Sequence, residues 1–224
     1  MPLPLKLAGV EVSIGGSPAP LLAVAPGNGY YQINAQVPLQ PKSTIGVEAI
    51  IKIAQGPVVF SHVVPLGKGP GEFFRFTGSE GAFQKASDFS PISEQNPALP
   101  GEAVIGYMTG LQTAVPNVPD GVVSPSFPLS TVPLLSPANG ADSYSIIIQT
   151  GNVVYRVAPL FVGLSPGLVG IFQVNFVMPL SSPGTKIESA MITLRYSRCI
   201  RVGLGGCTRL PDQLSGTVLM SVRR

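Results

Sequence analysis

Tryptophan is absent from this chain, and histidine occurs once, as His62, among 224 residues. One histidine cannot build a histidine-rich metal site, and the sequence contains neither H-E-x-x-H nor C-x-x-C. A Ser-His-Asp triad would need His62 beside a nucleophile elbow, but no G-x-S-x-G is present. The sequence therefore predicts no catalytic residue, no metal ligand and no cofactor, and we expect a protein that is not an enzyme.

Charge is also scarce. Charged residues make up 11% of the chain, which is less than half of the roughly 25% usual for soluble domains. The eleven acidic residues are scattered, and no D-x-D-x-D-G calcium loop is present. Six arginines follow residue 194 and are opposed only by Asp212, but no basic run is interleaved with aromatic residues. We expect a solvated basic edge there and no nucleic-acid partner.

Long hydrophobic runs are missing as well. No stretch reaches the roughly 18 uninterrupted apolar residues of a membrane-spanning helix, so we expect no membrane span. The first residues, M-P-L-P-L-K-L-A-G-V-E-V, have neither the charged start nor the long apolar segment of a signal peptide. This pattern fits a mature form or a fragment.

What the chain does contain is a series of short apolar runs. No apolar i, i+3, i+4, i+7 pattern is sustained, so helices are not predicted. Runs rich in Val, Ile and Leu are instead separated by turns, in a chain with 26 glycines and 24 prolines. This spacing predicts an all-β sandwich fold, with strands at residues 10–14, 31–37, 46–53, 58–64, 102–107, 144–149, 153–157, 170–177, 189–196 and 216–222.

An internal repeat organises these runs. A-P-L-L at residues 19–22 recurs as A-P-L-F at residues 158–161. G-Y-Y-Q-I-N-A-Q-V-P at residues 29–38 then matches G-I-F-Q-V-N-F-V-M-P at residues 170–179. The offset is about 140 residues, which predicts two copies of one sandwich.

The Gln-x-Asn element of the repeat comprises Gln32 and Asn34 in the first copy and Gln173 and Asn175 in the second. Both polar side chains of each pair lie on one face of a strand. We expect them to bond neighbouring loop backbone and to fix the turn, because a feature present in both copies favours fold maintenance over a single active site. Ligand contact is the alternative.

Four longer motifs carry a family resemblance. They are V-x-x-G-G-x-x-A-P-L…A-P-G…Y-Q-I-N-x-Q-V-P (12–38), N-P-A-x-P-G-x-x-V-x-x-Y-x-T-G-L (96–111), V-P-D-G-V-x-x-P-x-x-P-L-S (118–130) and A-P-L-F-x-G-L-x-P-G-x-x-G-x-F-Q-V-N (158–175). In this order the chain resembles, over nearly its whole length, the uncharacterised C-terminal domain family of large secreted acidobacterial proteins. The resemblance implies TIG-like immunoglobulin sandwiches at an extracellular or cell-surface location, and it implies no activity.

The repeat and the resemblance together predict two tandem immunoglobulin-like (TIG-like) β-sandwich modules. We expect the first module at residues 1–76 and the second at residues 100–224. The connection at residues 77–99 is expected to be irregular, with one short hairpin at most.

The first module lacks a strand that family members usually have. This strand, P-G-x-x-V-x-I-x-G-x-x-L, has its counterpart in the second module at residues 100–111. We therefore expect an open strand edge in the first module, completed by a strand from a neighbouring copy. Residues 1–7 are one candidate donor and residues 216–222 a weaker one, whereas filling from within the chain is the alternative.

Two remaining features concern rare residues. In V-V-F-S-H-V-V, alternation places His62 on the face shared by Phe60 and Val64, which favours a packed or edge-strand residue over a base. Cys199 and Cys207 flank a glycine-rich turn in an insertion. In a chain of exported type this spacing favours a disulfide that closes a hairpin tip, and two free buried thiols are the alternative.

Three function classes remain, and an enzyme, which would need a convergent pair of acidic residues in a deep pocket, fits least. The low charge and the missing strand favour a structural surface protein or filament subunit whose partners are copies of itself. An accessory module that binds a cell-surface protein or a glycan is the alternative. An exposed row of aromatic residues would favour a glycan-binding module, but the chain has no tryptophan and only six tyrosines.

Overall fold

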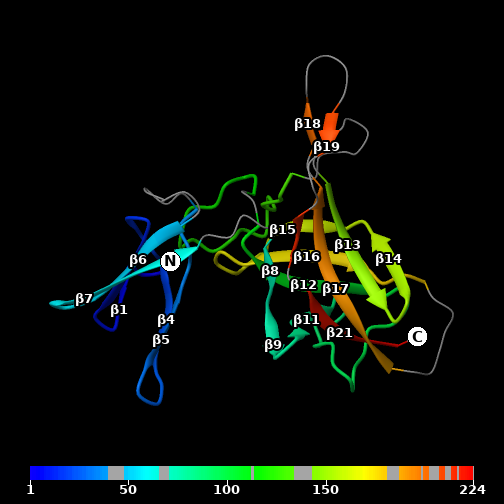
Figure 1. The fold of residues 1–224 in the computed structure, drawn as a ribbon, viewed down its shortest axis with the longest axis horizontal. Helices are drawn as coiled ribbons and strands as arrows, with labels where there is room; N and C mark the ends of the chain where they lie inside the picture. The colour runs from blue at the N-terminus through cyan, green and yellow to red at the C-terminus, as the bar shows by residue number, and fades with distance from the viewer. Residues whose placement is uncertain are drawn as a thin grey trace. The chain divides into compact units, whose positions relative to one another are not determined.

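The structure is a computed structural model that describes residues 1–39, 48–65, 71–111, 114–133, 143–180, 187–197, 199–201, 207–209, 213–215 and 217–223. These residues form strands, turns and irregular segments without a helix (Figure 1), which confirms the all-β prediction. The chain divides into two compact units. The first unit contains Met1–Lys68, Val115–Ser130 and Ser165–Gly170, and the second contains Gly69–Ala114, Thr131–Leu164 and Ile171–Arg224.

These units divide the chain differently from the predicted modules 1–76 and 100–224. Residues 72–85, expected at the end of the first module and in the connection, form strands of the second unit. Within the expected connection, β9 and β10 pair as a short hairpin through Thr77 and Glu80. Two later segments join the first unit instead. The difference arises because long-range pairings, which leave no local sequence pattern, decide where these segments pack.

The first unit contains strands β1 to β7. Its main sheet has the order β1-β2-β6-β7, with β3 also paired to β2, while β4 and β5 form a separate hairpin. The strands are β1 (Lys6–Leu7), β2 (Val10–Ile14), β3 (Ser17–Pro18), β4 (Leu21–Pro26), β5 (Tyr31–Ala35), β6 (Glu48–Gln55) and β7 (Val58–Pro65).

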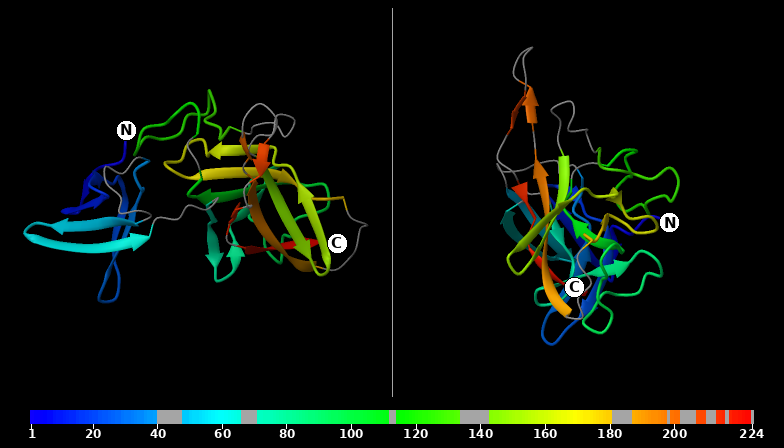
Figure 2. Two further views of the ribbon diagram at one scale, coloured as in Figure 1. Left: turned by 45° about the horizontal axis from the view of Figure 1, so that its top comes forward. Right: turned by 90° about the vertical axis from the view of Figure 1, so that its right-hand side faces the viewer.

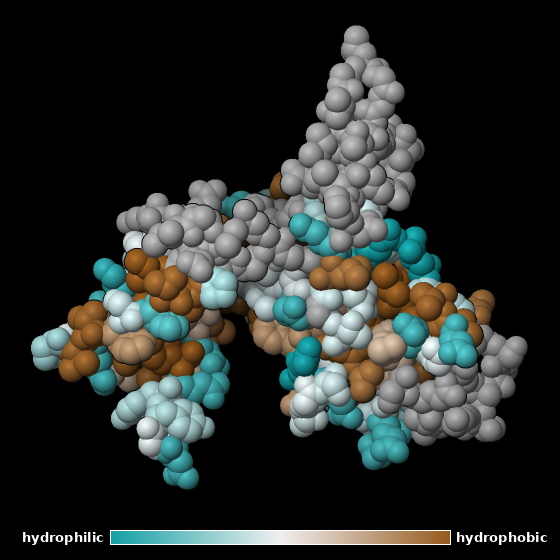
Figure 3. Space-filling view, viewed as in Figure 1, coloured by the Kyte–Doolittle hydropathy of each residue, from teal (hydrophilic) through white to brown (hydrophobic). Residues whose placement is uncertain are grey.

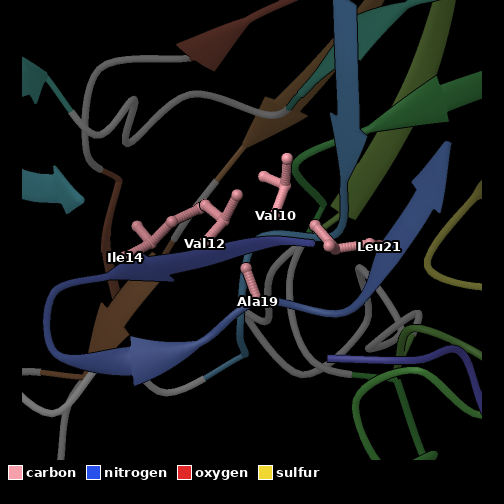
Figure 4. Packing of buried hydrophobic residues seen from close by; sticks show 5 residues of the cluster. All are labelled: Val10, Val12, Ile14, Ala19 and Leu21. Carbon is pink, nitrogen blue, oxygen red and sulfur yellow. The ribbon is translucent and has the colours of Figure 1, made fainter. Parts of the chain in front are cut away.

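The core of the first unit follows from the alternation of β2. Val10, Val12 and Ile14 of β2 are buried while Glu11 is exposed, as a period of two requires. Figure 4 shows these three side chains with Ala19 and Leu21 as one cluster. The partly buried residues packed against the cluster come from β1, from the β4–β5 hairpin and from β6: Leu7, Val24, Ile33, Ala35, Ile51 and Ile53.

The second unit is a sandwich of two larger sheets (Figure 2). One sheet has the order β14-β13-β17-β21-β10-β9, with β20 on β17, and the other has the order β11-β12-β16-β15, with β8 on β12. A separate ribbon pairs β18 with β19. The strands are β8 (Glu72–Phe73), β9 (Arg75–Thr77), β10 (Glu80–Gly81), β11 (Phe83–Lys85), β12 (Ala103–Thr109), β13 (Ser143–Thr150), β14 (Val153–Val157), β15 (Phe161–Leu164), β16 (Phe172–Val177), β17 (Ile187–Ser197), β18 (Cys199–Arg201), β19 (Cys207–Arg209), β20 (Gln213–Leu214) and β21 (Val218–Arg223).

Phe83 lies at the centre of the second unit and is fully buried. Its ring centroid is 5.3 Å from that of Phe73 and 6.3 Å from that of Phe176, the latter edge-on. Two glycines make room for it: a Cβ atom at Gly81 would lie 2.4 Å from the Phe83 ring, and one at Gly106 would lie 2.7 Å from it. The aromatic cluster therefore depends on residues 71–111, which add strands to both sheets.

The sequence repeat is also a repeat of strand order. Strands β3-β2-β6-β7 of the first unit lie in the same order as β14-β13-β17-β21 of the second, with the same antiparallel pairings. The β4–β5 hairpin likewise corresponds to β15–β16. Each unit thus contains the same six strands in the same order along the chain, and the second unit adds further strands to them.

Candidate functional site

The Gln-x-Asn pairs have the same internal contact in both units. Gln32 Nε2 donates a hydrogen bond to Asn34 Oδ1 at 3.0 Å, and Gln173 Nε2 donates one to Asn175 Oδ1 at 2.9 Å. Each bond joins side chains two residues apart on one strand face, whereas we expected bonds to loop backbone. The first pair is exposed and the second is half-buried. In both hairpins the contact of the motif is therefore internal to one strand.

The turn before the first Gln-x-Asn pair packs a tyrosine over a glycine. The Gly27 N–H donates to the Tyr30 carbonyl at 2.7 Å. A Cβ atom at Gly27 would lie 2.6 Å from the Tyr30 ring, so the ring occupies the space that a side chain would need. A side chain at the glycine of the A-P-G motif would therefore displace the tyrosine ring from this position.

The V-P-D-G segment, residues 118–121, belongs to the first unit and forms hydrogen bonds with residues that are distant in the sequence. The Asp120 carboxylate accepts the Leu39 N–H at 3.1 and 3.3 Å. The Gly121 N–H donates to Gln36 Oε1 at 2.7 Å, and the Gly121 carbonyl accepts the Leu3 N–H at 2.8 Å. The Asp120 carboxylate therefore holds backbone that lies 81 residues away in the sequence.

His62 lies on β7, an edge strand of the first unit's main sheet. Its ring stacks on Phe60, with ring centroids 6.5 Å apart and an interplanar angle of 23°. Both side chains are exposed. The predicted face shared with Phe60 is confirmed, and of the two expected environments, packed or edge strand, His62 has the edge strand.

The candidate contact surface is β7 itself. The strand is eight residues long and pairs with β6 on one side; no other described strand pairs with it. Val58 is 68% exposed and Phe60 is 60% exposed. In Figure 3, apolar residues reach the surface over the first unit, where Figure 1 draws β6 and β7. A long apolar edge strand of this kind is a template for pairing with another chain.

A second uncovered edge lies on β5. In the second unit the equivalent strand, β16, pairs with β15 and with all but one residue of β12. In the first unit β5 pairs with β4, and the ladders that the structure describes include no second neighbour for it. This is the position of the strand that the sequence predicted to be missing from the first module.

The two candidate donor segments are already paired within their own chain. Of residues 1–7, Lys6 and Leu7 pair with β2 as β1, and the Pro4 carbonyl accepts the Leu21 N–H at 2.8 Å. Residues 218–223 form β21, which pairs with β17 and β10. Neither segment is a free strand that could be donated to a neighbouring copy in this structure.

The cysteines lie on the β18–β19 ribbon, and their side chains fall outside the described part of the chain. The backbone register sets Cys199 opposite Arg209 and Cys207 opposite Arg201. The two cysteines therefore occupy one face of the ribbon in diagonal positions. Diagonal neighbours are separated by about 7–8 Å, so a bond between the cysteines requires a small movement of the backbone.

Ionisable groups elsewhere are tied to local structure. Hydrogen bonds from Ser90 lower the pKa of the Asp88 carboxyl, and burial raises the pKa of the Tyr107 hydroxyl, which donates to Gln84. Lys85 pairs with Glu102 at 3.3 Å, and Glu102 also accepts the Leu99 N–H. Within the described residues, no three His, Cys, Asp or Glu side chains gather as a metal site would need.

Comparisons with known proteins add no assignment. The chain matches no protein-family model, no curated protein and no solved structure. In the described ranges no helix is long and apolar enough to cross a membrane. The strand edges of the first unit are therefore the features on which a functional proposal can be built.

Proposed function

We propose that this chain is a non-catalytic structural protein of the cell exterior that associates with copies of itself through the uncovered strand edges of its first unit. The observation that carries the proposal is the contrast between equivalent strands. Strand β21 of the second unit has neighbours on both sides, whereas its equivalent β7 pairs with β6 alone among the described strands. Without a partner strand, the backbone N–H and C=O groups of an edge strand form hydrogen bonds with water and leave a site for another strand. Burying the apolar side chains beside them would favour association.

Two uncovered edges allow one copy to contact two neighbours. Strands β5 and β7 belong to different sheets of the first unit. If each edge pairs with another copy, contacts do not close after a single dimer, and a filament results. Both candidate donor segments are paired within their own chain. We therefore propose that the edge strands of two copies pair with each other and that no chain terminus is donated.

The finer parts of the proposal rest on the sequence. Two tandem immunoglobulin-like modules are supported by the strand order that the units share. The extracellular or cell-surface location is supported by the resemblance to domains of secreted proteins. The Cys199–Cys207 disulfide is supported by the spacing of the two cysteines across a glycine-rich turn.

The accessory binding module remains the second candidate, and one observation favours it. Tyr30 and Tyr31 lie side by side in the sequence at the β4–β5 turn and are both exposed. Adjacent exposed tyrosines can stack on a sugar ring or anchor a protein contact. Binding of a glycan array that is lost in a Tyr30→Ala, Tyr31→Ala double variant would support this candidate.

Electron microscopy of the purified chain, together with sedimentation velocity across a range of concentrations, tests the proposal. We expect species larger than a monomer whose share rises with concentration, and filaments at high concentration. A chain that sediments as a monomer at every concentration would contradict self-association and leave the binding module as the better candidate.

A further inference from the structure

The β6–β7 hairpin determines which backbone groups of β7 face outward. Gln55 and Val58 are opposite each other across the two-residue turn Gly56–Pro57. Gly56 has a φ of 59° and Pro57 is restricted to a negative φ, which are the requirements of a type II′ turn. In a two-residue hairpin, the residues that flank the turn exchange backbone hydrogen bonds, and the pattern then alternates along the ladder.

This alternation leaves three residues of β7 with their backbone groups at the free edge. Val58, Phe60, His62 and Val64 direct their N–H and C=O groups to β6, whereas those of Val59, Ser61 and Val63 point away from it. The next edge-facing position is Pro65, which has no N–H and ends the run of donors.

The sequence of β7 is symmetric about its middle residue. Ser61 is the middle residue of V-V-F-S-H-V-V, which covers residues 58–64. On each side of Ser61 the chain has one aromatic ring followed by two valines. We infer that β7 pairs antiparallel with β7 of a second copy of this chain, around a two-fold axis at Ser61. This inference rests on the proposed self-association and names the edge, the partner and the register.

The two-fold register satisfies backbone and side chains together. Ser61 pairs with Ser61 of the second copy and Val59 with Val63, and all of these residues have free edge-facing groups, so the ladder bonds form in both directions. Phe60 then lies opposite His62 of the second copy, at a position where the strands do not exchange hydrogen bonds and side chains approach most closely. A register centred on Ser61 also pairs all seven residues from Val58 to Val64 and leaves out Pro65, which has no N–H.

The pairing also extends the apolar face that the first unit leaves uncovered. Val12, Ile53 and Phe60 form one row across β2, β6 and β7, because each is paired with the next in register. Along this row the side chains change from buried to partly buried to 60% exposed. In the two-fold arrangement the row continues through His62 and Ile51 of the second copy, so the most exposed side chains gain neighbours on the same face.

Charge does not oppose the pairing. Strand β7 has no Lys, Arg, Asp or Glu, whereas the edge strand β14 of the second unit contains Arg156, the kind of residue that blocks edge pairing. Lys52 lies opposite Ser61 on β6. Two such lysines would lie three strand spacings apart, roughly 14 Å, which exceeds the Debye length at physiological salt.

A charge introduced at Ser61 tests the register, because in the two-fold pairing Ser61 lies opposite Ser61 of the second copy. We expect the intact wild-type chain to sediment partly as a dimer. Ser61→Lys and Ser61→Glu should each weaken association by about tenfold or more, since like charges then lie directly opposite each other. An equimolar mixture of the two variants should recover dimers of mixed composition. A Val154→Lys variant on the exposed edge strand β14 serves as the matched control and should associate like wild type.

Circular dichroism of each variant checks that the fold is retained, and Ser61→Glu provides a second variant should Ser61→Lys misfold. If wild type associates but both Ser61 variants associate equally well, or if the mixture recovers nothing, the two-fold register is wrong while self-association stands. If wild type is monomeric at every concentration, both this inference and the proposed function are wrong.

Discussion

The two units share six strands in one order but differ in what covers them. On β21 of the second unit, Val218 and Met220 are 0% and 3% exposed, whereas Val58 and Phe60 on the equivalent β7 are 68% and 60% exposed. The second unit gains β8 to β12 from residues 71–111, which pair with both of its sheets. A repeated sequence motif therefore fixes the shared hairpins, and strands from outside the repeat decide whether the edges are buried.

The largest expected effect concerns two phenylalanines, one in each unit. Phe83→Ala should lower the free energy of unfolding of the second unit by about 3–5 kcal/mol, because a fully buried ring leaves a cavity. Phe60→Ala should change the stability of the dilute chain by about 0.5 kcal/mol or less, because the ring is exposed. Urea denaturation followed by circular dichroism measures both values. Equal losses would mean that Phe60 is covered within its own unit.

The next effect concerns the β18–β19 ribbon. We predict a Cys199–Cys207 bond, and its reduction should lower the free energy of unfolding by about 2–3 kcal/mol. Intact mass measured with and without reductant should differ by two hydrogens. A Cys199→Ser, Cys207→Ser double variant should match the stability of the reduced chain. Free thiols in protein isolated without reductant would contradict the bond.

Two glycines sharpen the comparison further. Gly81→Ala places a Cβ atom against the buried Phe83 ring and should cost about 1–3 kcal/mol, because neighbours on all sides hold the ring. Gly27→Ala meets the Tyr30 ring, which is exposed and can swing outward, so the cost should be below about 1 kcal/mol. Thermal or urea denaturation of the two variants gives the comparison. A larger loss for Gly27→Ala would mean that the Tyr30 ring is fixed by a partner.

The smallest effect concerns the Gln-x-Asn pairs. Asn175→Ala removes the acceptor of a half-buried bond and should cost about 1 kcal/mol. Asn34→Ala removes an exposed one and should cost about 0.5 kcal/mol or less. Asn175→Asp keeps an acceptor oxygen for Gln173 and should restore most of the loss in the same denaturation assay. If both alanine variants are silent, the motif has no role in stability and the ligand-contact alternative gains support.

Local patterns in the sequence predicted the all-β class and many of the strands. The short apolar runs predicted the all-β class, and the period-two alternation predicted the strand face that His62 shares with Phe60, since both depend on residues close in sequence. The 29–38 and 170–179 repeat predicted strands that are equivalent in the two units, β5 and β16. The strands that pair with them, β4 and β15, were not predicted.

Long-range pairing explains what the sequence could not predict. The boundary at residue 76 differs from the compact units because β8 pairs with β12 and β10 pairs with β21, at separations that no local pattern encodes. The Asp120 contact with Leu39 has the same origin. Internal pairing of both candidate donor strands could not be inferred either, because a strand's composition does not indicate which neighbour it has.

Residue-resolved amide exchange along β7, measured by NMR at two protein concentrations, tests the central claim most directly. The strand contains its own control, since the N–H groups of Phe60 and His62 face β6 and those of Val59, Ser61 and Val63 face the edge. We expect the first set to exchange slowly at both concentrations and the second set to become protected only in the concentrated sample. Edge amides that exchange equally fast at both concentrations would contradict pairing through β7.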